Sequence, residues 1–211
     1  MNICRVLEIY AQRIQKQYRG FYIRNSLKKP RDGMTPELLN SCIDVYINTI
    51  QNEKQINKSL KIKKLRLSNF PSHISENIVK FAIAKKYNIM PNWDTKTGDL
   101  CIDNGISKMI RIEVKGSIDL FNGPPTFGPT ENWDRIYFVD GLKNQDKIYK
   151  IYEVRLSNHT EKWKNLKMSK TQTYYQQCQE KRRPRLTFKE LEAQLGNDCV
   201  IIFEGHLSEL F

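Results

Sequence analysis

The chain has 211 residues, of which 39% are hydrophobic and 27% are charged, a composition typical of a folded globular protein and not of a disordered one. No apolar run approaches the roughly 18 residues that a membrane-spanning helix requires, so a membrane protein is excluded as a class. A formal net charge of +12 indicates an anionic partner, of which a nucleic-acid backbone is the most obvious.

The first 68 residues are expected to form a basic and mainly helical region. Hydrophobic periodicity predicts an amphipathic helix over 3–19, and turn-forming residues predict a loop over 25–34. Thr35 followed by Pro36 predicts the start of a second helix.

Positive charge is concentrated in this N-terminal region, which carries 14 Lys and Arg residues against 5 Asp and Glu residues. The segment 54–66 contains six basic residues and no acid. Lys61, Lys63 and Lys64 are therefore candidate contacts to a nucleic-acid backbone, although a solvated surface would explain the same pattern.

The rest of the chain alternates between helical and strand patterns. We expect a helix over 72–87 with Ser72 as its cap, strands over 99–103, 109–116, 135–140 and 147–155, helices near 169–181 and 188–195, and a final strand over 199–203. Thr187 and Glu190 have capping-box spacing, and Gly196 can end that helix. This order predicts an α/β (α+β) fold, a central mixed β-sheet flanked by helices.

Three charged residues fall on the first two predicted strands. Alternation places Glu113 and Lys115 on one strand face, opposite the apolar residues between them. Asn104-Gly105 favours a tight turn, whose register would send Asp99 and Glu113 to opposite faces. A five-residue connection over 104–108 instead pairs Asp99 with Glu113 and gathers the apolar residues of both strands on the other face, so burial favours it.

This register predicts a site for a divalent metal. Paired strand residues have Cβ atoms about 5 Å apart, so Asp99 and Glu113 could share a cation, and oxygen ligands favour Mg²⁺. Such a cation activates water, and Lys115 could orient or deprotonate that water and offset the charge on a phosphate. Glu76, on the preceding helix, is a further candidate acid.

Each of these signals has a plainer explanation. An amphipathic strand with a solvated Glu113 and Lys115 explains that triplet equally well, and the turn-like Asp94-Thr95-Lys96 shows that chance supplies such triplets. Glu76 fits an ordinary exposed helix position.

Gly98-Asp99, followed by Glu113-Val114-Lys115 at a strand end and preceded by a helix glutamate, resembles the PD-(D/E)xK nucleases, and among them the type II restriction endonucleases. The resemblance covers residues 72–140, and Gly98 stands where the family pattern has proline. It implies a restriction-endonuclease-like core in which Asp99 and Glu113 bind metal, Lys115 is catalytic and Glu76 is auxiliary. It also implies a homodimer that cuts double-stranded DNA with Mg²⁺, for which Mn²⁺ can substitute, to leave 5′-phosphate ends.

On this hypothesis the chain is a single nuclease domain over 1–211. Its parts are the basic helical region over 1–68, the catalytic core over 72–155 and a C-terminal helix and strand region over 156–211. The first two helices are candidates for the dimer contact.

Two further segments are candidate DNA contacts. The Gly- and Pro-rich segment 122–130 presents Thr126 and Thr130, and the basic segment after the first C-terminal helix presents Lys181, Arg182, Arg183 and Arg185. Arginine can read guanine in the major groove, but phosphate contact is the commoner role, and a connector loop or a solvated basic turn would look the same.

Other functional classes have less support in the sequence. A Gly-rich phosphate loop is absent, so no nucleotide cofactor is expected, and five scattered cysteines without a Cys-x-x-Cys pair indicate a reducing, cytoplasmic protein. Two alternatives remain open: another nuclease on the same core, such as a junction resolvase or repair nuclease, and a non-catalytic DNA-binding protein.

Overall fold

A computed structural model describes residues 34–93, apart from 61–66, and residues 98–211, apart from 104–108, 119–130 and 185. The chain divides into two compact units, Met1–Ser68 and Asn69–Phe211, which are described separately. In the described part of the chain, no helix combines the length and the hydrophobicity needed to cross a bilayer.

The described part of the first unit is one long helix, α2 (Pro36–Ser59). The side chain of Thr35 accepts a hydrogen bond from the amide of Leu38 and caps the helix, and Pro36 occupies its first turn, as predicted. At its other end, the Glu53 carboxylate accepts hydrogen bonds from the amide and hydroxyl of Ser68 at 2.8 and 2.6 Å. The predicted helix over 3–19 and the segment 25–33 lie outside the described residues.

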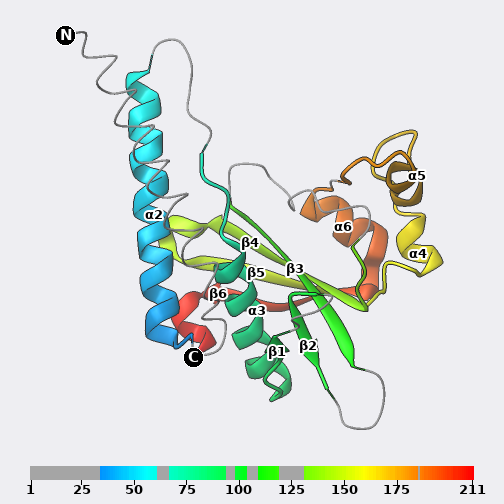
Figure 1. Cartoon of the computed structure of the whole chain (residues 1–211), viewed down its shortest axis with the longest axis horizontal. Coiled ribbons are helices and arrows are strands. Elements are labelled where there is room, and N and C mark those ends of the chain that lie inside the picture. The colour runs from blue at the N-terminus through cyan, green and yellow to red at the C-terminus, as the bar shows by residue number, and fades with distance from the viewer. Residues whose placement is uncertain (1–33, 61–66, 94–97, 104–108, 119–130, 185) are drawn as a thin grey trace. The chain divides into compact units, whose positions relative to one another are not determined.

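The second unit is built on a six-stranded mixed sheet in which the strands follow one another in chain order (Figure 1). The strands are β1 (Asn92–Trp93), β2 (Leu100–Ile102), β3 (Ile110–Ile118), β4 (Arg135–Lys143), β5 (Ile148–Val154) and β6 (Cys199–His206). Only β3 and β4 run parallel to each other; every other neighbouring pair is antiparallel. The predicted α+β fold with a mixed sheet is confirmed.

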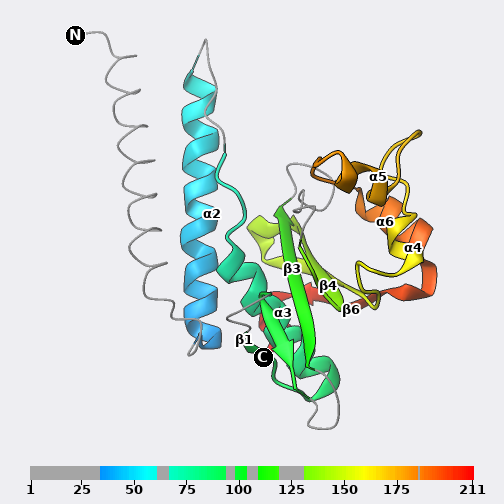
Figure 2. The ribbon, with the colours of Figure 1, turned by 45° about the vertical axis from the view of Figure 1, so that its right-hand side comes forward.

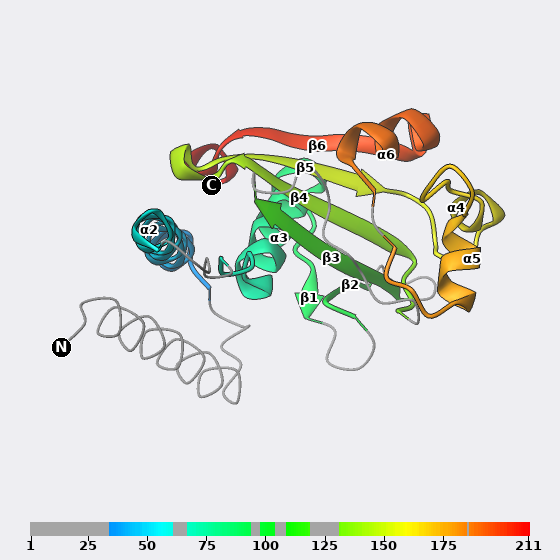
Figure 3. The ribbon, with the colours of Figure 1, turned by 90° about the horizontal axis from the view of Figure 1, so that it is seen from above.

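Helices cover both faces of this sheet. Helix α3 (Ser72–Tyr87) lies on one side of β3 and β4, and the short helices α4 (Glu161–Lys164), α5 (Tyr174–Gln179) and α6 (Phe188–Leu195) lie on the other side (Figures 2 and 3). On the α3 side, the buried Glu153 carboxylate accepts hydrogen bonds from four side chains: Tyr87, Tyr137, Arg135 and Arg155.

An aromatic core joins the sheet to the second group of helices. Trp163 of α4 is fully buried, and its ring meets those of Trp133 and Tyr174 edge-on at centroid distances of 5.6 and 5.7 Å. Phe188 of α6 stacks on Tyr152 of β5 at 4.9 Å. These contacts hold the segment that leads into β4 and the helices that follow β5.

The helix predicted over 72–87 is confirmed as α3, but its predicted cap and the predicted start of the helix over 169–181 are wrong. Ser72 is the first helical residue and not the cap of α3; Pro71 takes the cap position, without a side-chain hydrogen bond. The helix predicted from 169 begins only at Tyr174, because the side chain of Thr173 accepts a hydrogen bond from the amide of Gln176 and starts the helix there. The predicted capping box of Thr187 and Glu190 on α6 is confirmed, with Gly196 at the C-cap.

The β2–β3 hairpin has the predicted longer register. Cys101 pairs with Arg111 and Leu100 pairs with Ile112, whereas a two-residue turn at Asn104-Gly105 would shift this pairing. The resulting apolar face is buried: Leu100, Ile102, Ile112 and Val114 are each at most 8% exposed. Burial therefore sets the register, and Asp99 falls opposite Glu113.

Candidate active site

Asp99 is bound to the backbone of β3 on both sides of Glu113. Its amide donates a hydrogen bond to the carbonyl of Ile112 at 3.1 Å. Its carboxylate oxygen Oδ2 accepts a hydrogen bond from the amide of Val114 at 2.8 Å. The aspartate side chain therefore lies against β3 at the level of Glu113, as the register requires.

Glu113 is a buried carboxyl group whose charged form is disfavoured by its surroundings. Its residue is 7% exposed, and burial together with the negative charge of Asp99 raises its pKa to about 7. The neighbouring Lys115 ammonium acts in the opposite direction without cancelling the effect. Two carboxylates held this close in a shielded site are an arrangement that a divalent cation would stabilise.

Lys115 lies between two carboxylates. Its ammonium forms an ion pair with Glu113, and its Nζ atom lies 3.4 Å from Oε2 of Glu131. Burial by itself would lower the pKa of Lys115, but Glu113, Glu131 and Asp99 outweigh this effect and raise it. Lys115 is therefore an ammonium ion at neutral pH and offers positive charge at the site.

Glu131 was not among the residues predicted from the sequence. It follows the segment 119–130, which is not described, and precedes β4. The one signal that could have pointed to it is an acid at the entry of a strand that neighbours β3, but the sequence does not reveal which strand that is.

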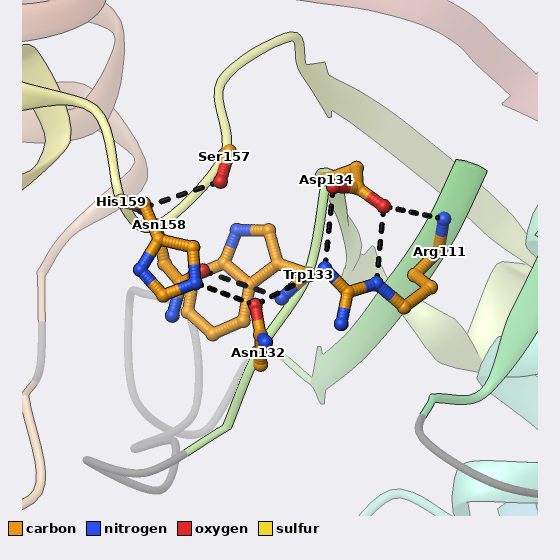
Figure 4. A network of polar contacts seen from close by, with 7 residues as sticks. All are labelled: Arg111, Asn132, Trp133, Asp134, Ser157, Asn158 and His159. Carbon is orange, nitrogen blue, oxygen red and sulfur yellow. Dashed lines mark hydrogen bonds and ion pairs between the residues drawn. The ribbon is translucent and has the colours of Figure 1, made fainter. Parts of the chain in front are cut away.

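The segment that carries Glu131 is joined to β3 by an ion pair. The Arg111 amide and Nε atom donate to Oδ2 of Asp134 at 3.0 and 3.1 Å, and Arg111 Nη2 lies 3.4 Å from Oδ1 (Figure 4). Arg111 lies two residues before Glu113, on the same face of β3. The entry to β4 is therefore fixed against the strand that carries Glu113 and Lys115.

The position of Glu76 differs from the exposed helix position that its sequence context allows. It lies on α3 and is only 2% exposed. Its role as an auxiliary acid stays a prediction.

Among the described residues, no three or more His, Cys, Asp and Glu side chains cluster closely enough to hold a metal ion. Asp99 and Glu113 stay the predicted ligands of a divalent cation.

The predicted DNA contacts are placed only in part. Lys61, Lys63, Lys64, Thr126, Thr130 and Arg185 lie outside the described residues. Lys181, Arg182 and Arg183 are exposed just after α5, where Lys181 takes a left-handed conformation with φ 57°. Arg182 pairs with Glu180 at 2.9 Å and donates to Gln172 at 3.2 Å. This basic turn is exposed, and its contact with DNA stays a prediction.

Comparisons with known proteins identify the family of this chain. The Bsp6I restriction endonuclease family model matches residues 39–192, which include the β2–β3 hairpin, Glu131 and α5. The type II restriction enzyme Bsp6I of Bacillus sp. (strain RFL6) is 28% identical over 134 residues, which cover 64% of this chain and 71% of that enzyme. No solved structure matches. Because the family model matches well over half of the chain, this protein belongs to the Bsp6I restriction endonuclease family of type II restriction enzymes.

Proposed function

We propose that this restriction enzyme binds double-stranded DNA and hydrolyses phosphodiester bonds within a short specific sequence, using Mg²⁺ and leaving 5′-phosphate ends. The observation that carries the proposal is the β2–β3 hairpin, where Asp99 and the buried Glu113 converge beside the Lys115 ammonium. This pairing supports the PD-(D/E)xK arrangement that the sequence resembles.

The donor set of the site fits a hard divalent cation. Both candidate ligands are carboxylates, and the raised pKa of Glu113, about 7, reflects its burial and the repulsion from Asp99, both of which a bound cation would offset. When bound, Mg²⁺ or Mn²⁺ supplies Lewis-acid stabilisation of the charge that builds up on the scissile phosphate. Asp99 and Glu113 would hold it, and water would complete its coordination.

The protein residues around this cation site have two further roles, which are to orient a ligand and to offset negative charge. The amide of Val114 fixes the Asp99 carboxylate at 2.8 Å, so this ligand is oriented before a cation arrives. The Lys115 ammonium lies on the same strand face as Glu113, where it would offset negative charge on the attacked phosphate and orient the attacking water. Its raised pKa favours this electrostatic role over that of a general base.

We propose that the basic surfaces contact DNA and that the active form of the enzyme is a homodimer. Lys181, Arg182 and Arg183 are exposed and would contact phosphates or base edges, together with Arg185, Thr126, Thr130, Lys61, Lys63 and Lys64. A two-fold symmetric dimer would place one site on each strand of a palindromic sequence.

The test is incubation of a long unmethylated DNA with the protein and Mg²⁺, Mn²⁺ or a chelator, followed by sequencing of the fragment ends. Discrete fragments with a common end sequence and 5′-phosphates, formed only with the cation, are expected. Lys115→Ala should abolish cleavage and leave DNA binding within about threefold, because it removes one charge from the site and none from the DNA-binding surfaces. Lys170→Ala, at an exposed position, is the matched control.

Three results would contradict the proposal. Random fragment ends would argue against sequence specificity. Cleavage confined to branched DNA would indicate a junction resolvase. Binding without cleavage under any cation would indicate a non-catalytic DNA-binding protein.

A further inference from the structure

The Glu131 side chain directs one oxygen inward, toward Lys115. This residue is 29% exposed at its side chain, yet its Oε2 atom is buried and lies 3.4 Å from the Lys115 Nζ atom. That distance is longer than the roughly 2.7–2.9 Å of a charge-assisted hydrogen bond. Glu113 is the closer partner of the ammonium, and Glu131 is the second one.

The backbone at Glu131 is held by one amide side chain. Nδ2 of Asn158 donates to the carbonyl of Glu131 at 2.7 Å, and Oδ1 of the same residue accepts from the amide of Trp133 at 3.3 Å. The Asn158 amide thus bridges the peptide groups on either side of Asn132. Glu131 is fixed by the turn that follows β5, although it borders a segment that is not described.

A second set of contacts holds the residue in between. Oδ1 of Asn132 lies 2.8 Å from Nε2 of His159 and 3.4 Å from Nη2 of Arg111. Figure 4 shows Asn132 between the turn that carries Asn158 and His159 and the Arg111 side chain of β3. The segment 131–134 is therefore held by hydrogen bonds both to the turn after β5 and to Arg111 of β3.

We propose that Glu131 is a positioning residue for Lys115, an inference that rests on the proposed function. Glu113 is at once the main partner of the ammonium and a candidate cation ligand. When its oxygens turn to a cation, the ammonium keeps Glu131 as a fixed carboxylate partner. Glu131 then holds the ammonium beside the scissile phosphate.

The first test measures how firmly the amine of Lys115 is held, without DNA and without catalysis. Reductive methylation of lysines is followed by mass spectrometry in the wild type and in Glu131→Gln, each with and without Ca²⁺, a hard cation that oxygen ligands bind. Lys115 should stay protected in the wild type under both conditions. In Glu131→Gln it should be protected without Ca²⁺, because Glu113 holds it, and should be labelled roughly five to ten times faster with Ca²⁺, once its second partner is lost.

The second test separates positioning from DNA binding. Glu131→Gln should lower kcat about 10- to 100-fold and leave KM within about twofold, because a misplaced group costs rate while the DNA contacts persist. Glu131→Asp keeps the charge on a shorter side chain and should recover part of kcat. Glu161→Gln, which removes an exposed carboxylate that pairs with Lys164 within α4, is the matched control for net charge and should match the wild type in both tests.

The outcomes are distinguishable. If Lys115 in Glu131→Gln is labelled at the wild-type rate with Ca²⁺, or if kcat of this variant equals that of the wild type, Glu131 does not position Lys115. If the wild type itself fails to cleave DNA, the proposed function fails, and the labelling result still decides whether Glu131 holds the ammonium. Unfolding by urea confirms that each variant is folded.

Discussion

Replacement of Glu113 by glutamine should inactivate the enzyme and, in the absence of a divalent cation, stabilise it. Glutamine has nearly the same shape but carries no charge, so it removes the repulsion from Asp99 and the cost of burying an anion. The free energy of unfolding should therefore rise with this substitution at neutral and higher pH.

The magnitude follows from the pKa of Glu113. A pKa raised from 4.5 to about 7 corresponds to about 3 kcal/mol against the charged form in the folded state. The side chain is only 9% exposed, so solvent screening reduces this value little. The opposing attraction of Lys115 is already contained in the shifted pKa.

The sign can be checked from the two pKa values. Below pH 4.5 the carboxyl group is protonated in both the folded and the unfolded state, and the wild type and the variant should differ little. Between pH 4.5 and 7 the unfolded state releases its proton first, so the wild type loses stability as the pH rises. Above pH 7 the full difference of about 3 kcal/mol in favour of Glu113→Gln should be present.

Mg²⁺ should cancel most of this difference. A cation present at 100 times its dissociation constant adds about 2.7 kcal/mol of stability to a protein that binds it only when folded. This gain belongs to the wild type, whereas the variant has lost one candidate ligand. The two proteins should then be about equally stable at pH 8.

Urea unfolding at pH 4, 6 and 8, with EDTA or with Mg²⁺, measures these differences. Tryptophan fluorescence is the appropriate probe, because Trp93, Trp133 and Trp163 all lie in the second unit with the site. Glu161→Gln serves as the control and should show no such pH dependence. If Glu113→Gln is no more stable than the wild type at pH 8 in EDTA, the carboxylates are not held together under repulsion, and the argument for a cation site loses its basis.

Three further substitutions test the scaffold. Glu153→Ala leaves the hydroxyls of the buried Tyr137 and the half-buried Tyr87 and two arginines without their shared acceptor, and should lower the free energy of unfolding by about 3–5 kcal/mol in urea. Gly116→Ala places a Cβ atom 2.5 Å from Phe70 Cδ1 and 2.7 Å from Ser75 Cβ, so β3 or these side chains must shift. About 1–3 kcal/mol of stability should be lost, and the cleavage rate should fall. A wild-type cleavage rate would show that the strand has room for the methyl group. Trp163→Ala removes a fully buried ring and should cost about 3–5 kcal/mol, and a loss below 1 kcal/mol would mean that this core repacks freely.

The local patterns of the sequence were sufficient for most elements and for the hairpin. Alternation along β3 and the demand to bury Leu100 and Ile112 selected one register, and the structure has it. That register brings Asp99 to Glu113 without any information from distant parts of the chain. The caps at Thr35 and Thr187 were also readable, since a side-chain oxygen acts on an amide only three residues away.

Predictions failed where competing local signals were equally plausible. The helix over 72–87 has the predicted bounds, but Ser72, a good cap by type, is its first helical residue, and Pro71 takes the cap position. The first residues of the helix expected over 169–181 fit a helix by pattern, but Thr173 caps a later start. In both cases the identity of the residues allowed more than one boundary.

The sequence by itself thus determined the paired acids and the lysine, because neighbouring strands joined by a short connection follow from alternation and burial. Only the tertiary structure decided that β4 lies parallel to β3, that Asn158 and Arg111 hold the entry to β4, and that Glu131 reaches Lys115. These contacts join residues 16 to 27 positions apart in the chain, and no local periodicity encodes them. They arise only when the whole sheet and the helices on its faces pack together.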